Sequence, residues 1–105
     1  MDEVVARATA TFTDSGYEGT SIDRLVAATG VHRGSLYATF GSKRGLFVAA
    51  LRAEPPVDLL LVALLELAPR DAEVRRLLRP YLDALPDTAS TLGAHLLQRA
   101  GLDKE

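Results

Sequence analysis

The chain has 105 residues, 48% of them hydrophobic and 25% charged, with a formal net charge of −2, which is typical of one globular domain and argues against a disordered chain. It has no cysteine, which excludes disulfides, thiolate metal sites and cysteine nucleophiles, and its two separated histidines do not make a metal site. The most apolar run, residues 59–65, is far shorter than the ~20 residues that span a bilayer, so we expect a cytoplasmic protein without a membrane segment.

Two helices are predicted before residue 30. Apolar residues at helical spacing indicate a first helix over residues 3–15, with Gly16 as its C-terminal cap. Thr20 is expected to open a second helix over residues 20–29, because Thr20 and Asp23 fit a capping box. Gly30 is expected to end that helix, since glycine adopts a left-handed backbone at no steric cost.

A third helix is predicted over residues 33–40, with Leu36 and Phe40 facing inward. Gly41 should end it, and Ser42 should cap a fourth helix over residues 43–53. The Pro-Pro pair at residues 55–56 ends that helix and gives the clearest boundary in the chain. The remaining helical candidates cover residues 57–68, 71–85 and 88–101, and no strand alternation is seen, so the predicted fold class is all-α.

The second and third predicted helices form a motif. Two short helices joined by a turn containing Gly30 match a helix-turn-helix over about residues 20–40. In such a motif the second helix enters the major groove of DNA, while its neighbours hold the phosphate backbone. Five basic side chains and no acidic one lie between residues 24 and 53, which predicts a local positive patch. Double-stranded DNA is therefore the expected partner.

Two segments carry a resemblance to a known family. G-Y-E-G-T-S-I at residues 16–22 and G-V-x-x-G-S-L-Y-x-x-F-x-S-K at residues 30–43 closely resemble the TetR family of bacterial transcriptional regulators. The resemblance runs from residue 3 to residue 53 without a gap. It implies a DNA-binding domain at residues 1–53, linked by helix 4 to a C-terminal helical region at residues 54–105 for ligand binding and dimerisation.

The resemblance also implies a function. We expect a sequence-specific regulator, a repressor that binds a palindromic operator as a homodimer and responds to a small apolar effector. Such a protein would act on the bacterial nucleoid within the cytoplasm. It would not be an enzyme, and the sequence agrees, because it contains no paired carboxylates, activated nucleophile or phosphate-binding loop. No cofactor is implied.

The family's contact positions map onto this sequence. Arg33 is expected to read guanine, the methyl groups of Ala38 and Thr39 to meet thymine, and Gly34 to let the backbone approach the DNA. Lys43, at the start of helix 4, is expected to bind phosphate. Two positions depart from the pattern, because histidine replaces the usual serine cap at residue 32 and threonine replaces a histidine at residue 39. The expected DNA-binding residues are Thr20, Ser21, His32, Arg33, Gly34, Ser35, Tyr37, Ala38, Thr39 and Lys43.

The second half resembles the family less. Only 52 residues follow residue 53, whereas family members carry a much longer region there, so the chain is either a truncated member or part of a longer protein. Tyr81 and His95 are weak candidates for effector binding, with ordinary packing as the alternative. A second functional hypothesis is a ligand-blind interaction module that pairs with a full-length relative.

Overall fold

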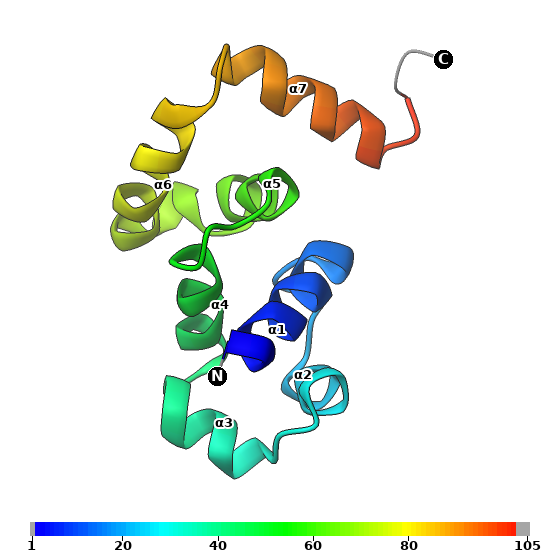
Figure 1. Ribbon diagram of the computed structural model, residues 1–105, viewed down its shortest axis with the longest axis vertical. Coiled ribbons are helices and arrows are strands. Elements are labelled where there is room, and N and C mark those ends of the chain that lie inside the picture. Colours follow the sequence, from blue (N-terminus) through cyan, green and yellow to red (C-terminus); the bar gives the residue numbers. More distant parts are fainter. Residues whose placement is uncertain (1, 103–105) are drawn as a thin grey trace. The chain divides into compact units, whose positions relative to one another are not determined.

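The computed structural model describes residues 2–102, and every regular element in this range is a helix (Figure 1). The all-α prediction is therefore confirmed. No helix in the range combines the length and the apolar character that crossing a bilayer would take. The helices are α1 (Asp2–Ser15), α2 (Ile22–Thr29), α3 (Arg33–Phe40), α4 (Lys43–Leu51), α5 (Val57–Glu66), the short 3-10 turn η1 (Ala68–Arg70), α6 (Ala72–Ala84) and α7 (Thr88–Arg99).

The chain divides at the Pro55-Pro56 junction into two compact units, the N-terminal unit and the C-terminal unit. In the N-terminal unit, α1 packs against α2 and α4, and α3 packs against α2 and α4 (Figure 1). Phe12, Leu25 and Phe47, from three different helices, are fully buried between them. The rings of Phe12 and Phe47 meet edge to face with centroids 5.0 Å apart, a geometry that aromatic pairs favour.

The ends of the short helices follow from capping chemistry. Gly30 has a φ of 74° and ends α2 in the left-handed conformation, as expected. Ser42 caps α4 as expected, its hydroxyl accepting a hydrogen bond from the Gly45 N–H at 2.9 Å. The predicted start of α2 was wrong: the cap is Ser21 rather than Thr20, and its hydroxyl accepts from the Arg24 N–H at 3.0 Å.

In the C-terminal unit, the almost wholly apolar α5 contributes a run of buried residues from Leu59 to Ala63. The amphipathic helix α6 begins at the N-cap Asp71, whose carboxylate accepts from the Val74 N–H at 3.2 Å, and it buries Val74 and Leu78. The apolar faces of the two helices supply the core of this unit, as their spacing predicts.

Helix α7 belongs to the same unit but buries none of its residues. It packs against α5, where the Asp58 carboxylate lies 3.2 Å from Nδ1 of His95 and 3.7 Å from the guanidinium of Arg99. Leu96 and Leu97 remain 44% and 50% exposed. Half-buried residues such as Leu92, together with the polar contacts to Asp58, therefore join α7 to its unit.

Candidate nucleic-acid interface

Helix α3 presents most of its surface to solvent. Leu36 is 3% exposed and Phe40 is half-buried, and these two side chains anchor the helix to the N-terminal unit. Every other side chain of α3, and that of the preceding His32, is exposed. We call this surface the α3 face, and it consists of His32, Arg33, Gly34, Ser35, Tyr37, Ala38 and Thr39. The structure thus gathers these predicted DNA-binding residues on one helix and its cap.

Tyr37 contributes a phenol to the α3 face. Its side chain is 43% exposed, so the phenol is not part of the core formed by Phe12 and Phe47. A phenolic O–H can donate to a phosphate oxygen. The structure therefore leaves the predicted contact of Tyr37 sterically open.

Two neighbouring helix N-termini add anion-binding character. The first-turn N–H groups of a helix lack intrahelical partners and carry a partial positive charge. At α2 the exposed Ser21 accepts a hydrogen bond through its hydroxyl oxygen, which leaves the O–H itself able to donate. His32, at the N-terminus of α3, makes no side-chain capping bond, so its imidazole is not used in closing that helix.

The prediction for Thr20 needs a correction. Its side chain is fully buried, and its hydroxyl donates to the Gly16 carbonyl at 2.6 Å. A buried hydroxyl satisfied in this way cannot reach a phosphate, so Thr20 shapes the turn before α2 instead of contacting DNA. Ser21, the next residue, is the exposed one of the pair.

The predicted phosphate contact of Lys43 stays a prediction, and the structure gives its ammonium partners within the protein. Nζ donates to the carbonyls of Tyr17 at 3.0 Å and Thr20 at 3.2 Å. It also lies 4.3 Å from the centroid of the Tyr17 ring, within the range of a cation–π contact. Lys43 therefore points into the turn between α1 and α2.

The basic patch is less positive than the sequence stretch suggests. Arg33 forms an ion pair with Asp23 of α2, and Arg24 lies 3.4 Å from the carboxylate of Asp14. Both acids precede the acid-free stretch in sequence, and helix packing brings them beside its arginines. A count of charges by segment cannot reveal these partners, because packing brings them from outside the stretch.

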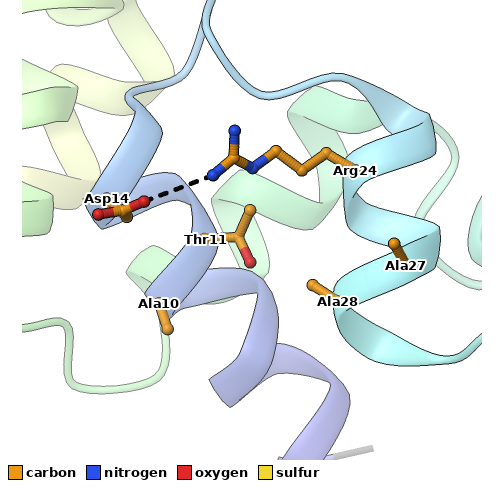
Figure 2. Close-up of a pocket in the computed structure, with 6 residues that line it drawn as sticks. All are labelled: Ala10, Thr11, Asp14, Arg24, Ala27 and Ala28. Atoms are coloured by element: carbon orange, nitrogen blue, oxygen red, sulfur yellow. Dashed lines mark hydrogen bonds and ion pairs between the residues drawn. The ribbon is translucent and has the colours of Figure 1, made fainter.

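A groove of about 400 Å³ lies between α1 and α2, with the Arg24–Asp14 pair at one end (Figure 2). It exists because its other lining side chains are small, so the facing helix surfaces leave space between them. It contains no residue of the α3 face. The groove is lined by Ala10, Thr11, Asp14, Arg24, Ala27 and Ala28.

The packing roles of Tyr17 and Gly45 were not predicted from the sequence. Tyr17 stacks on Phe12 with ring centroids 5.9 Å apart and meets Phe47 edge to face at 5.2 Å. Gly45 packs so closely that a Cβ on it would collide with the Phe40 carbonyl. The second glycine in G-S-K-R-G at residues 41–45 was the only available signal for this close approach.

Tyr81 and His95 lie outside a hollow that the described part of the C-terminal unit contains. This hollow has a volume of about 140 Å³, below the ~300 Å³ at which small-molecule pockets usually begin. Neither Tyr81 nor His95 lines it, and His95 instead faces Asp58. The hollow is lined by Leu64, Ala68, Arg75, Leu78, Arg79 and Leu82.

Comparison with known proteins agrees with this geometry. Residues 4–50 match the family model described as bacterial regulatory proteins, tetR family. The chain is 46% identical over 50 residues to the uncharacterized HTH-type transcriptional regulator YezE of Bacillus subtilis, covering 48% of this chain and 26% of that protein. It is 40% identical over 52 residues to the HTH-type transcriptional repressor AcnR of Corynebacterium glutamicum, covering 50% and 28%.

A third relative, the HTH-type transcriptional repressor ComR of Escherichia coli, is 46% identical over 50 residues, which is 48% of this chain and 24% of that protein. The chain thus aligns with about a quarter of the length of these relatives. No solved structure gives a significant match. The matched segment contains α2, the Gly30 turn and α3, together with most of α1 and α4. Residues 4–50, within the N-terminal unit, are therefore similar to the tetR family of bacterial regulatory proteins.

Proposed function

We propose that the protein is a sequence-specific DNA-binding transcriptional regulator that acts as a repressor. The observation that carries the proposal is the α3 face, a helix held by Leu36 and Phe40 that exposes all its other side chains. Its place in a TetR-type helix-turn-helix supports the same reading, and two relatives are named as transcriptional repressors. DNA on the nucleoid would be its site of action.

The dimensions of α3 suit the major groove. Eight helical residues rise about 12 Å, and a helix of about 10–12 Å diameter fits a groove about 12 Å wide. In this position Arg33 would donate to guanine, and the methyl groups of Ala38 and Thr39 would meet thymine. Gly34, with nothing near the place of a Cβ, would let the backbone approach the bases.

Phosphate contacts would come from exposed hydroxyl groups of α3 and of the start of α2. Tyr37 and Ser35 are exposed on α3, and the exposed Ser21 stands at the N-terminus of α2. A hydroxyl beside free helix amides is a suitable partner for a phosphate oxygen. His32 would add a contact through its imidazole, which makes no side-chain capping bond in α3.

Binding would require Arg33 to exchange Asp23 for a base. The pair is exposed, with 53% and 81% of the two side chains accessible, and such pairs typically contribute about 0–1 kcal/mol. A bidentate contact with guanine provides roughly 1–3 kcal/mol of discrimination. Exchanging Asp23 for guanine is therefore favourable on a duplex with guanine at this position. On a duplex without it, Arg33 keeps its pair with Asp23 and binding is weaker.

A homodimer on a palindromic operator completes the proposal. One α3 reads only a half-site, and two copies related by a two-fold axis would read both halves of a symmetric duplex. A small apolar effector acting on the C-terminal helices would change the spacing of the two α3 helices and lower operator affinity. Light scattering of the protein with and without duplex measures the stoichiometry.

Selection of bound duplexes from a random pool tests the proposed function. We expect enrichment of a palindrome whose half-sites are centred about 10 base pairs, or a multiple of that, apart. The enriched duplex should then bind more tightly than a scrambled duplex of the same length at the same salt concentration. Failure to enrich any sequence would refute sequence-specific recognition.

Replacing Arg33 with alanine should relax the preference at one base pair of each half-site. We expect a loss of about 1–3 kcal/mol on the preferred duplex and little change on a duplex altered at that pair. Competition binding with single-position duplex variants measures the effect. The matched control is Arg7→Ala, since Arg7 is an exposed arginine of α1 that pairs with Glu3. Equal losses on every duplex would contradict base reading by Arg33.

Replacing Tyr37 with phenylalanine removes only the phenolic oxygen. If that group donates to a phosphate, affinity should fall by about tenfold, because a hydrogen bond to a charged group contributes roughly 1.5 kcal/mol. The fall should be similar on preferred and scrambled duplexes, since phosphates carry no sequence. Fluorescence anisotropy measures both, with Tyr81→Phe as the control. A loss confined to the preferred duplex would contradict a backbone contact.

A further inference from the structure

Lys43 lies at the first position of α4 but makes its contacts in the turn between α1 and α2. Its ammonium meets two carbonyl oxygens and the face of an aromatic ring, all supplied by the segment from Tyr17 to Thr20. A lysine has three N–H donors and no other polar group. With two donors used and the cation placed over a ring, most of its bonding capacity is taken within the protein.

The segment that receives Lys43 is itself well fixed. The Thr20 N–H donates to the Tyr17 carbonyl at 3.2 Å, and the buried Thr20 hydroxyl donates to the Gly16 carbonyl. The Tyr17 ring packs against Phe12 of α1 and Phe47 of α4. These contacts hold the turn in one conformation. Lys43 links it to α4 by hydrogen bonds to residues that are 23 and 26 positions away in the sequence.

The joined positions are next to the N-termini of the two helices that pack against α3. The Thr20 carbonyl belongs to the peptide that leads into Ser21, the N-cap of α2, and Lys43 follows Ser42, the N-cap of α4. Helix α3 packs against both α2 and α4. A displacement of the start of α4 would therefore reach the first turn of α2 directly through Lys43, without passing through α3.

We propose that Lys43 is a positioning residue, whose ammonium holds the N-terminus of α4 to the Tyr17–Thr20 turn and so fixes the first turn of α2 as a phosphate anchor. The positioning role rests on the contacts above, and its effect on DNA rests on the proposed function. It differs from a direct phosphate contact in two measurable ways. The positioning effect should be measurable without DNA. Replacing Lys43 should also leave the number of counterions released on DNA binding unchanged.

The test without DNA is amide hydrogen exchange in Lys43→Met, followed at Thr20 and Arg24. These N–H groups are bonded to the Tyr17 carbonyl and the Ser21 hydroxyl, so loosening of the turn should speed their exchange by about tenfold. The Leu36 N–H, bonded within α3 to the His32 carbonyl, serves as an internal reference and should change little. Arg7→Met removes one positive charge elsewhere and should leave all three amides unchanged.

The test with DNA is the salt dependence of binding to the selected duplex. For Lys43→Met we expect affinity to fall by about tenfold while the slope of log K against log salt stays that of the unmodified protein. A slope reduced in magnitude by about 0.9, with exchange unchanged, would show a direct phosphate contact and overturn the proposal. Unchanged exchange and unchanged affinity would overturn it equally.

Two conservative variants keep the test decisive. Lys43→Gln can still donate to one carbonyl and should give an intermediate acceleration, and it replaces Lys43→Met if that variant does not fold. Lys43→Arg keeps a cation with several donors and should retain protection within about threefold of the unmodified protein. If the chain binds no duplex, the proposed function fails, while the exchange experiment still decides whether Lys43 holds the turn.

Discussion

Replacing Phe47 with alanine is expected to destabilise the N-terminal unit by about 3–5 kcal/mol. Phe47 is fully buried, and its ring meets those of Phe12 and Tyr17 edge to face with centroids 5.0 and 5.2 Å away. The change removes apolar surface from the core and leaves a cavity that α1 and α4 cannot close without moving. A domain of this kind is stable by about 5–15 kcal/mol in total, so much of its stability would be lost.

Denaturant unfolding followed by circular dichroism measures this effect, with duplex binding as a second readout that should fall with the folded fraction. Leu65→Ala is the matched control, because Leu65 is 65% exposed and its truncation should change stability by less than about 0.5 kcal/mol. If the free energy of unfolding of the Phe47→Ala protein lies within about 1 kcal/mol of the unmodified value, as expected for the control, Phe47 does not belong to the core.

Replacing Gly45 with alanine is expected to cost about 3 kcal/mol, the upper end of the usual range for overpacking. An added Cβ would collide with the backbone carbonyl of Phe40, and a backbone atom cannot move aside as a flexible side chain can. The end of α3 would have to shift away from α4. Since the orientation of α3 depends on this contact, we expect duplex binding to fall further than the loss of folded protein explains.

Gly34→Ala is the matched control for Gly45→Ala. Both glycines lie in helices, where alanine is intrinsically favoured by roughly 0.8–1.0 kcal/mol, but a Cβ at residue 34 would meet nothing within 4 Å. Gly34→Ala should therefore raise stability while it weakens DNA binding through closer crowding of the bases. Denaturant unfolding measures the stability of both variants, and fluorescence anisotropy measures their DNA binding. Equal stability effects in the two variants would refute the close approach of α4 to Phe40.

Local chemistry made much of the fold predictable. Apolar spacing gave the helices, and the bounds of α3 are those predicted. Gly30 and Ser42 end and begin helices for reasons confined to a few neighbouring residues. Thr20 and Ser21 could not be separated in this way, because both carry hydroxyls that can cap. Burial decided between them, and it depends on how α2 packs against α1.

The part of the candidate interface that could not be predicted rests on contacts distant in sequence. Tyr37 and its neighbours on α3 could be identified from the motif, since exposure on one helix follows from its apolar positions. The partners of Lys43 lie 23 and 26 residues away, and Asp23 lies 10 residues from Arg33. Only the packing of α4 and α2 brings Lys43 to its carbonyl partners and Arg33 to the carboxylate of Asp23.

The sparse anchoring of α3 bears on how such a protein can change over generations. Only Leu36 is deeply inserted into the core from this helix, with Phe40 half-inserted at its end. Substitutions at well-exposed positions usually alter stability by less than about 0.5 kcal/mol. New combinations of side chains on α3 can therefore arise while the scaffold stays intact, and descendants of one ancestor could come to govern different promoters.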